Sequence, residues 1–270
     1  MNIANKTILV TGAGSGIGKE LAIALIEKNA KVVAVDIHEA TLQELKKFLG
    51  EKSKRLSTYV ADISSKTAVE ALSKNVISDE GHIDGLINVA GIIQPFVKVN
   101  ELDYDAINRV MNINFFGTLF MVKSFLPSLL KRPEAHIVNI SSMGGFLPVP
   151  GQSIYGASKA AIKMLTEGLY AELKDTNVKV SVVFPGATQT NISINSGVKI
   201  PEQQKNPSKK QAIKMLPASE AARLIIVGIE KNKLQIFLGS DSKLMNTLYR
   251  LNPVFAINLI AKQMKSLLSK

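Results

Sequence analysis

The sequence predicts an α/β fold: a doubly wound parallel sheet of about seven strands in a single domain. Short apolar runs rich in Val and Ile alternate with amphipathic helical patterns from residue 7 to residue 238. Such alternation is typical of a parallel sheet covered by helices on both faces. A cluster of glycines at residues 12–18 lies between the first apolar run and the first helical pattern, as in sheets that bind nucleotides. The composition does not change at any point where a second domain would begin.

The expected strands are short and mostly apolar on both faces, and they fall at 7–10, 31–36, 56–60, 85–88, 136–141, 178–184 and 234–238. Apolar residues recur with helical spacing between them, which predicts helices at 17–29, 41–49, 66–78, 103–130, 154–174 and 219–231. The strands and helices thus form one continuous series, and we assign residues 1–240 to a single domain.

Two segments depart from this alternation. Residues 188–216 carry five lysines together with Pro201 and Pro207, and so long an insertion after a strand is often functional. We interpret it as a substrate lid. Residues 241–270 form a C-terminal helical extension with an apolar stripe and a kink expected at Pro253; the stripe consists of Leu244, Leu248, Leu251, Phe255 and Leu259.

The charge of +11 is concentrated in the last quarter of the chain. Residues 199–270 hold 13 Lys and Arg against four Asp and Glu, whereas residues 1–198 hold 20 against 18. A nearly neutral body argues against nucleic-acid binding, which needs a basic recognition surface. The absence of cysteine excludes disulfides and thiolate zinc sites. His38, His82 and His136 lack metal-ligand spacing, so no metal is expected. Without a secretory segment or an apolar run of membrane-spanning length, a cytoplasmic location is the simplest interpretation.

The glycine turn predicts a phosphate-binding site. Glycines let the backbone turn sharply and approach a pyrophosphate, and the start of the following helix presents N–H groups to it. A turn that only packs strand on helix is the alternative. The expected contacts are Gly12, Gly14, Ser15, Gly16, Ile17 and Gly18.

Asp36 ends the second expected strand, 18 residues after Gly18. A carboxylate there can accept hydrogen bonds from the adenosine ribose hydroxyls and would repel a 2′-phosphate. No Lys or Arg occupies positions 37–40, so NAD is favoured over NADP. The alternative is that Asp36 caps the helix expected near Thr41.

At this point the sequence resembles the short-chain dehydrogenase/reductase family in its compact single-domain branch, whose fold is of the Rossmann type. The matching motifs follow the family's order over residues 7–190: Thr11-Gly-Ala-Gly-Ser-Gly-Ile-Gly18, Asp62-Ile63, Asn88-Val-Ala-Gly91, Asn112-Ile-Asn114, Ser142, Tyr155-Gly-Ala-Ser-Lys159, and Pro185-Gly186 with Thr190. Val89 departs from the family, which often has a second Asn there.

Tyr155 and Lys159 are the expected centre of the chemistry. They are four residues apart on a helix and share one face. A neighbouring ammonium would lower the pKa of the phenol, so that Tyr155 exchanges a proton with the substrate oxygen. The resemblance adds that Lys159 binds the nicotinamide ribose.

Ser142 and Asn114 complete the predicted catalytic group. Ser142 follows the fifth expected strand, at the edge of the sheet where active sites of this fold lie, and its hydroxyl would hold the substrate oxygen; Ser141 beside it is the alternative. The resemblance implies that Asn114 anchors a water connecting Lys159 to solvent.

The resemblance also implies the remaining cofactor contacts. Asp62 and Ile63 would lie against adenine, Asn88, Ala90 and Gly91 beside the dinucleotide, and Pro185, Gly186 and Thr190 at its nicotinamide end. Apolar residues that follow Gly91 and Ser142 would form the substrate pocket, among them Ile93, Met143 and Phe146.

These observations predict an NAD-dependent oxidoreductase that interconverts a hydrophobic secondary alcohol and its ketone. A non-catalytic dinucleotide-binding sensor or scaffold is the alternative. The resemblance implies a homodimer or homotetramer. Residues 243–270 carry basic residues and no acid, so they could contact an anionic membrane surface, although packing on the body or on a sister subunit is favoured.

Overall fold

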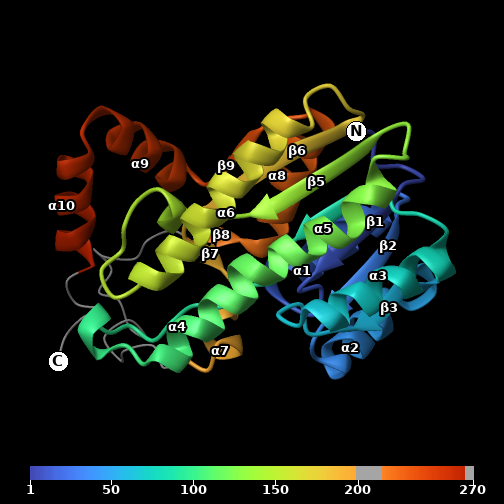
Figure 1. Cartoon of the computed structure of the whole chain (residues 1–270), viewed down its shortest axis with the longest axis horizontal. Coiled ribbons are helices and arrows are strands. Elements are labelled where there is room, and N and C mark those ends of the chain that lie inside the picture. The colour runs from blue at the N-terminus through green and yellow to red at the C-terminus, as the bar shows by residue number, and fades with distance from the viewer. Residues whose placement is uncertain (199–214, 265–270) are drawn as a thin grey trace.

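A computed structural model describes residues 1–198 and 215–264. Its centre is a seven-stranded sheet with the order β3-β2-β1-β4-β5-β6-β9 (Figure 1). Every pair of neighbouring strands in this sheet is parallel. The strands are β1 (Thr7–Thr11), β2 (Lys31–Asp36), β3 (Leu56–Val60), β4 (Gly85–Asn88), β5 (Ala135–Ile140), β6 (Val178–Pro185) and β9 (Gln235–Leu238). The predicted parallel α/β sheet is confirmed.

Helices cover both faces of the sheet. One face carries α1 (Gly16–Glu27), α2 (Glu39–Leu49) and α8 (Ala218–Glu230), whose apolar residues form one core with the strands. The other carries α3 (Lys66–Glu80), α5 (Thr118–Leu129) and α6 (Ser153–Glu172), which share a second core. The strands are buried on both faces, which explains why their sequences read as continuous apolar runs rather than as alternating ones.

The strand order places the site. β1 lies between β2 and β4, so the chain leaves β1 toward one half of the sheet and resumes at β4 in the other half. At such a switch point the loops after the two strands diverge and leave a crevice at their carboxyl ends. The loop after β1 holds the glycine turn, and the loop after β4 holds Ala90 and Gly91.

The helix expected at 103–130 is interrupted. It consists of α4 (Tyr104–Met111), a π-helical turn (Asn112–Gly117) and α5. The widened turn contains Asn114, whose side chain is bonded to residues outside the helix. Apolar periodicity does not reveal a π-helical turn, because the turn changes the helix register by only one residue.

The C-terminal extension differs from the predicted kinked stripe. It forms two separate helices, α9 (Ser240–Leu251) and α10 (Pro253–Gln263), joined by Asn252 in an extended conformation. Proline disfavours the helical conformation in the residue before it, and the Asn252 side chain then caps α10 by accepting a hydrogen bond from the Phe255 amide at 2.9 Å. The chain therefore changes direction, and Figure 1 shows both helices at one end of the molecule.

Because of this break, the predicted stripe does not form one buried face. Leu251 and Phe255 are exposed, whereas Met245, Ala256 and Ile260 are buried against the loop after β5. The inner face of the extension thus packs on the body. No helix in the described part of the chain is long and apolar enough to cross a membrane.

The described part of the predicted lid is short. β7 (Thr188–Gln189) pairs with β8 (Leu216–Pro217) beside the main sheet, and α7 (Ile192–Asn195) follows β7. Residues 199–214 of the lid lie outside the described residues.

Candidate active site

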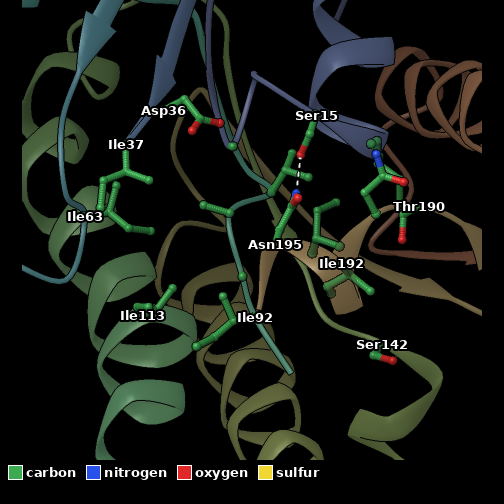
Figure 2. Close-up of a pocket in the computed structure, with 18 of the residues that line it drawn as sticks. Ser15, Asp36, Ile37, Ile63, Ile92, Ile113, Ser142, Thr190, Ile192 and Asn195 are labelled. Atoms are coloured by element: carbon green, nitrogen blue, oxygen red, sulfur yellow. Dashed lines mark hydrogen bonds between the residues drawn. The ribbon is translucent and has the colours of Figure 1, made fainter. Parts of the chain in front are cut away.

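A cleft of about 410 Å³ lies at the carboxyl ends of the parallel strands. Figure 2 shows Asp36, Ile37 and Ile63 at one end of it and Ser142 and Thr190 toward the other. Fifteen predicted site residues line it: Gly12, Ser15, Gly16, Ile17, Asp36, Asp62, Ile63, Ala90, Gly91, Ser142, Tyr155, Lys159, Pro185, Gly186 and Thr190. The fold therefore brings residues from across the sequence into one elongated cavity of ligand-binding size.

The glycine turn forms one wall of the cleft. Gly12 has φ +66°, and a Cβ on it would lie 2.9 Å from the Ala90 Cα, so only glycine fits between the loops after β1 and β4. Ser15 is the N-cap of α1 and makes no capping bond with its side chain. Its hydroxyl instead accepts a hydrogen bond of 2.8 Å from Asn195 Nδ2 of α7 (Figure 2).

Asp36 fixes the turn at the far end of the cleft. Its carboxylate accepts one hydrogen bond from the Gly14 amide at 2.9 Å and one from the His38 amide at 3.0 Å. The alternative reading of Asp36 as a helix cap is wrong, since His38 is the N-cap of α2. The carboxylate lies on the cleft lining, where it can also face a ribose.

The same end of the cleft is apolar. Ile37, Ile63 and Ile113 point into it from three different elements (Figure 2). Neighbouring Asp62 turns its carboxylate toward Ser64, accepting bonds from the Ser64 amide at 2.9 Å and hydroxyl at 2.7 Å. Apolar side chains on several sides suit an aromatic group such as adenine.

Tyr155 and Lys159 lie together at the other end, one turn apart on α6. The Lys159 ammonium is 5.9 Å from the centre of the Tyr155 ring and donates a hydrogen bond of 2.9 Å to the Ile140 carbonyl. Burial lowers the pKa of Lys159 to about 8.

The pKa of Tyr155 differs from the sequence-based expectation. Burial raises this pKa, and a hydrogen bond with the Ser142 side chain opposes the rise. The predicted lowering by Lys159 is thus wrong for this geometry, because removal of the phenolate from water outweighs an ammonium that is itself buried. Tyr155 accordingly keeps its proton at neutral pH. Ser142, rather than Ser141, faces the phenol, since the Ser141 hydroxyl donates to the Lys159 carbonyl at 2.7 Å.

Asn114 is fully buried behind the cleft and does not line it. Its amide oxygen accepts from the Ile92 amide at 2.8 Å, and its amide nitrogen donates to the Ile92 carbonyl at 2.9 Å and to Ser158 Oγ at 3.0 Å. A Cβ on Gly91 would lie 3.1 Å from both Asn114 Oδ1 and Lys159 Nζ. Asn114 and Lys159 therefore meet at Gly91, where a larger residue would crowd both side chains.

Three predicted cofactor contacts lie behind the cleft wall. Gly14 presents its amide to Asp36, Gly18 lies against the Gly12 carbonyl, and Asn88 donates a hydrogen bond of 2.8 Å to Asn139. Each holds a lining residue or strand in place, and direct contact of each with a cofactor stays a prediction.

The three predicted substrate-pocket residues do not line the described cleft. Met143 packs against the C-terminal extension, Phe146 packs on the rings of Phe184 and Phe237, and the Ile93 amide donates to Ser196 Oγ at 3.0 Å. Their role in substrate binding stays a prediction.

Sequence reasoning missed several lining residues. Ile37 and Ile192 point into the cleft (Figure 2), and Arg109 lies one helical turn before Ile113 on the same helix face. Position next to Asp36 was the available signal for Ile37, but α7 offered none. Ile92, one of the apolar residues after Gly91 that the sequence assigned to the substrate pocket, does line the cleft. Among the described residues, no cluster of His, Asp or Glu side chains could hold a metal ion.

Comparison with known proteins identifies the class. The family model described as short chain dehydrogenase matches residues 6–200. The oxidoreductase SadH of Mycobacterium tuberculosis is 31% identical over 250 residues, which cover 91% of this chain and 90% of that protein. Dehydrogenase/reductase SDR family member 7B of Mus musculus is 31% identical over 244 residues, covering 87% of this chain and 74% of that protein.

Solved structures agree in fold. A short-chain dehydrogenase/reductase from Burkholderia phymatum in complex with NAD has a TM-score of 0.80 at 26% identity, covering 93% of this chain and 96% of its own. A short-chain dehydrogenase from Burkholderia cenocepacia in complex with NADP also has a TM-score of 0.80 at 26% identity, covering 96% and 99%.

Fold and site together define an oxidoreductase that depends on a nicotinamide dinucleotide. The chain belongs to the short-chain dehydrogenase/reductase family. The lining of the cleft fits such a cofactor. The glycine turn lies along it, isoleucines and the Asp36 carboxylate lie at one end, and the buried Tyr155–Lys159 pair lies at the other.

Proposed function

We propose that the protein interconverts a hydrophobic secondary alcohol and its ketone, with NAD as the preferred cofactor and Tyr155 as general acid and base. The observation that carries this proposal is the burial of Tyr155 and Lys159 on one turn of α6, with Ser142, Tyr155 and Lys159 all on the cleft lining. The bound nicotinamide supplies or accepts the hydride. The following steps concern what the protein's own residues do.

Ser142 holds the substrate oxygen and Tyr155 exchanges a proton with it. Because burial raises the pKa of Tyr155, the phenol is protonated at neutral pH and is ready to donate to a ketone. In the reverse direction the same oxygen must accept the alcohol proton, which becomes easier as the pH rises.

Lys159 supplies positive charge beside the phenol. With a pKa lowered by burial to about 8, it is still mostly protonated at pH 7, and this charge stabilises the phenolate that forms in the oxidation direction. Asn114 lies next to Lys159 at Gly91 and can anchor a proton path toward solvent, as the family resemblance implies.

The preference for NAD rests on Asp36. Its carboxylate lies on the lining of the adenine end, and Ile37 and His38 follow it. A 2′-phosphate would approach a carboxylate with no Lys or Arg at positions 37–40 to balance its charge.

The hydrophobic substrate class rests on the apolar lining near Ser142. Ile92 from the loop after β4 and Ile192 from α7 both point into the cleft (Figure 2). A polar substrate would find few hydrogen-bonding partners there and would lose hydration without compensation.

The alternative is a dinucleotide-binding sensor or scaffold without catalysis. A sensor needs only the glycine turn and Asp36, whereas this chain also keeps Ser142, Tyr155, Lys159 and Asn114.

The test measures binding and turnover separately. Fluorescence titration with NADH and NADPH gives both affinities, and absorbance at 340 nm follows turnover with secondary alcohols of increasing chain length. We expect tighter binding of NADH and turnover that rises with chain length. Tight NADH binding without turnover on any alcohol or ketone of the panel would favour the sensor.

We further propose that the protein is a homodimer or homotetramer assembled through α4, α5 and α6. Large apolar side chains are exposed on these helices and on the π-helical turn between α4 and α5, namely Tyr104, Phe116, Met164 and Tyr170. Isolated exposed apolar residues are common, but a face spread over adjacent helices indicates an interface. Sedimentation equilibrium tests this, and a monomer at micromolar concentration would contradict it.

We also propose that the outer side of α9 and α10 rests on an anionic membrane surface. Leu251 and Phe255 are 78% and 54% exposed where the two helices meet. Lys243, Arg250 and Lys262 flank them, and residues 242–270 contain no acid. Two such basic surfaces would repel each other in a contact between copies, whereas anionic lipid complements them.

Sedimentation of the full chain with vesicles tests this contact. Binding is expected to vesicles containing phosphatidylserine at 50 mM salt, with a loss of at least tenfold in the double variant Leu251→Glu/Phe255→Glu. Phe48→Glu, which changes an exposed aromatic residue on α2, is the matched control. Equal binding by wild type and the double variant would contradict the proposal.

A further inference from the structure

The three residues that follow the Asn88–Gly91 motif after β4 are each hydrogen bonded to a different element. The Ile92 backbone is held by Asn114. The Ile93 amide donates to Ser196 Oγ beside α7 at 3.0 Å. The Gln94 side chain reaches the first turn of α6. This loop therefore connects the π-helical turn, the described part of the lid and the helix that carries Tyr155.

The first turn of α6 lacks a cap of its own. A helix leaves its first backbone N–H groups without partners inside the helix, and the N-cap side chain usually accepts from the second or third of them. The N-cap of α6 is Gln152, whose side chain makes no such bond. Gln94 Oε1 takes its place and accepts from the Ile154 amide at 2.8 Å and from the Tyr155 amide at 3.0 Å.

The other half of the Gln94 amide is fixed as well. Gln94 Nε2 donates to the Gly151 carbonyl at 3.0 Å. The backbone carbonyl of Gln94 also accepts a hydrogen bond from Gln152 Nε2 at 2.8 Å. The side chain is fully buried. With donors on one side and an acceptor on the other, only one orientation of the amide satisfies its partners.

We propose that Gln94 is the positioning residue for Tyr155: it caps α6 from outside the helix and thereby holds the phenol at Ser142. The proposal rests on the proposed role of Tyr155 as acid and base. Gln94 lies outside the cleft lining and acts through the backbone of Tyr155. Because proton transfer depends steeply on distance, a displacement of about 1 Å in this turn can cost on the order of a hundredfold in rate.

Gln94→Met tests the capping bonds. Methionine has a similar volume but can neither accept from the two amides nor donate to Gly151. We expect kcat to fall at least tenfold, with less than a twofold change in the KM for NAD. Gln94→Glu keeps an oxygen that accepts from the Ile154 and Tyr155 amides, so it is expected to restore at least part of the lost kcat.

Thr166→Val is the matched control for stability. Thr166 is buried on α6 about three turns further on, where its hydroxyl donates to the Ile162 carbonyl at 2.6 Å and accepts from Asn139 Nδ2 at 3.0 Å. It should lower the Tm with kcat within twofold of wild type. A Gln94→Met variant that lowers only the Tm, or a Gln94→Glu variant no more active than Gln94→Met, would overturn the proposal.

A titration independent of turnover separates this proposal from the proposed function. The protein has five tyrosines and no tryptophan, so the absorbance at 295 nm of each protein minus that of its Tyr155→Phe counterpart reports the phenol of Tyr155. Gln94→Met, which leaves the first turn of α6 uncapped, should shift the midpoint of Tyr155 by at least 0.5 pH unit. Gln94→Glu, whose protonated carboxyl can still donate to the Gly151 carbonyl, should stay near the wild-type midpoint. Absence of turnover in the wild type would count against the proposed function alone, whereas an unchanged Tyr155 midpoint in Gln94→Met would count against the role of Gln94.

Discussion

Asn195 of α7 and Ser15 of the glycine turn are joined by a 2.8 Å hydrogen bond although 180 residues separate them in the sequence. Both side chains line the cleft (Figure 2). The bond therefore ties α7, in the described part of the predicted lid, to the turn predicted to bind the pyrophosphate. The Ser196 side chain forms a second tie, to the Ile93 amide in the loop after β4.

Removal of the first tie should speed cofactor release. In Asn195→Ala the lid keeps its backbone but loses its bond to Ser15, and one neutral hydrogen bond is worth about 0.5–1.5 kcal/mol. We expect NADH to dissociate roughly two- to tenfold faster in stopped-flow fluorescence. Ser193→Ala changes a neighbouring residue of α7 that does not line the cleft and should release NADH at the wild-type rate. Equal rates for all three proteins would show that the bond does not hold the lid.

Neutralising Asp36 should reduce the discrimination between cofactors. Asp36→Asn removes the charge that would repel a 2′-phosphate. It also leaves only one oxygen for the Gly14 and His38 amides, from which the carboxylate now accepts two hydrogen bonds. We therefore expect weaker NADH binding and a fall of at least tenfold in the ratio of NADPH to NADH dissociation constants. Glu39→Gln, which removes a nearby charge at the start of α2, is the control and should leave the ratio unchanged. Tighter binding of NADPH than of NADH by the wild type would contradict the proposed role of Asp36 in cofactor preference.

Buried His136 should make stability depend on acidity. Burial lowers its pKa to about 3, and the positive charges of the N-terminus and Lys179 act in the same direction. The unfolded chain, with an ordinary histidine pKa near 6.5, binds this proton first, so stability is complete above about pH 6.5 and is lost as the pH falls toward 3.

The measurement is urea unfolding at pH 7 and pH 5. His136 alone should remove about 2 kcal/mol of the free energy of unfolding between these values. His136→Gln keeps a polar atom near Ser181, the present partner of the ring at 2.8 Å, and should lose correspondingly less on acidification. An identical loss in both proteins would show that His136 does not titrate in this way.

The sequence predicted what short local patterns encode. The strands, the glycine turn and the Tyr155–Lys159 pair could be predicted because apolar runs, glycines and a spacing of four each have a direct structural meaning. The motif order then indicated Ser142 and Asn114, which the fold brings to the same end of the cleft, Ser142 on its lining and Asn114 behind it.

The remainder depends on contacts between distant segments. Gln94 resembles any polar loop residue until α6 is placed beside it, and Asn195 has no partner until α7 meets the glycine turn. The raised pKa of Tyr155 likewise follows from burial, which spacing along a helix does not predict. The packing of Phe146 on the rings of Phe184 and Phe237 also joins segments far apart in the sequence, so position after Ser142 could not predict it.

The central claim is that Tyr155 transfers the proton in a reaction with a hydrophobic ketone or alcohol. The most direct measurement is the single-turnover decay of NADH absorbance at 340 nm with a hydrophobic ketone, in the wild type and in Tyr155→Phe. The account predicts that both proteins bind NADH with similar affinity and that the variant reacts at least a thousandfold more slowly. A variant that binds NADH and reacts at the wild-type rate would contradict it.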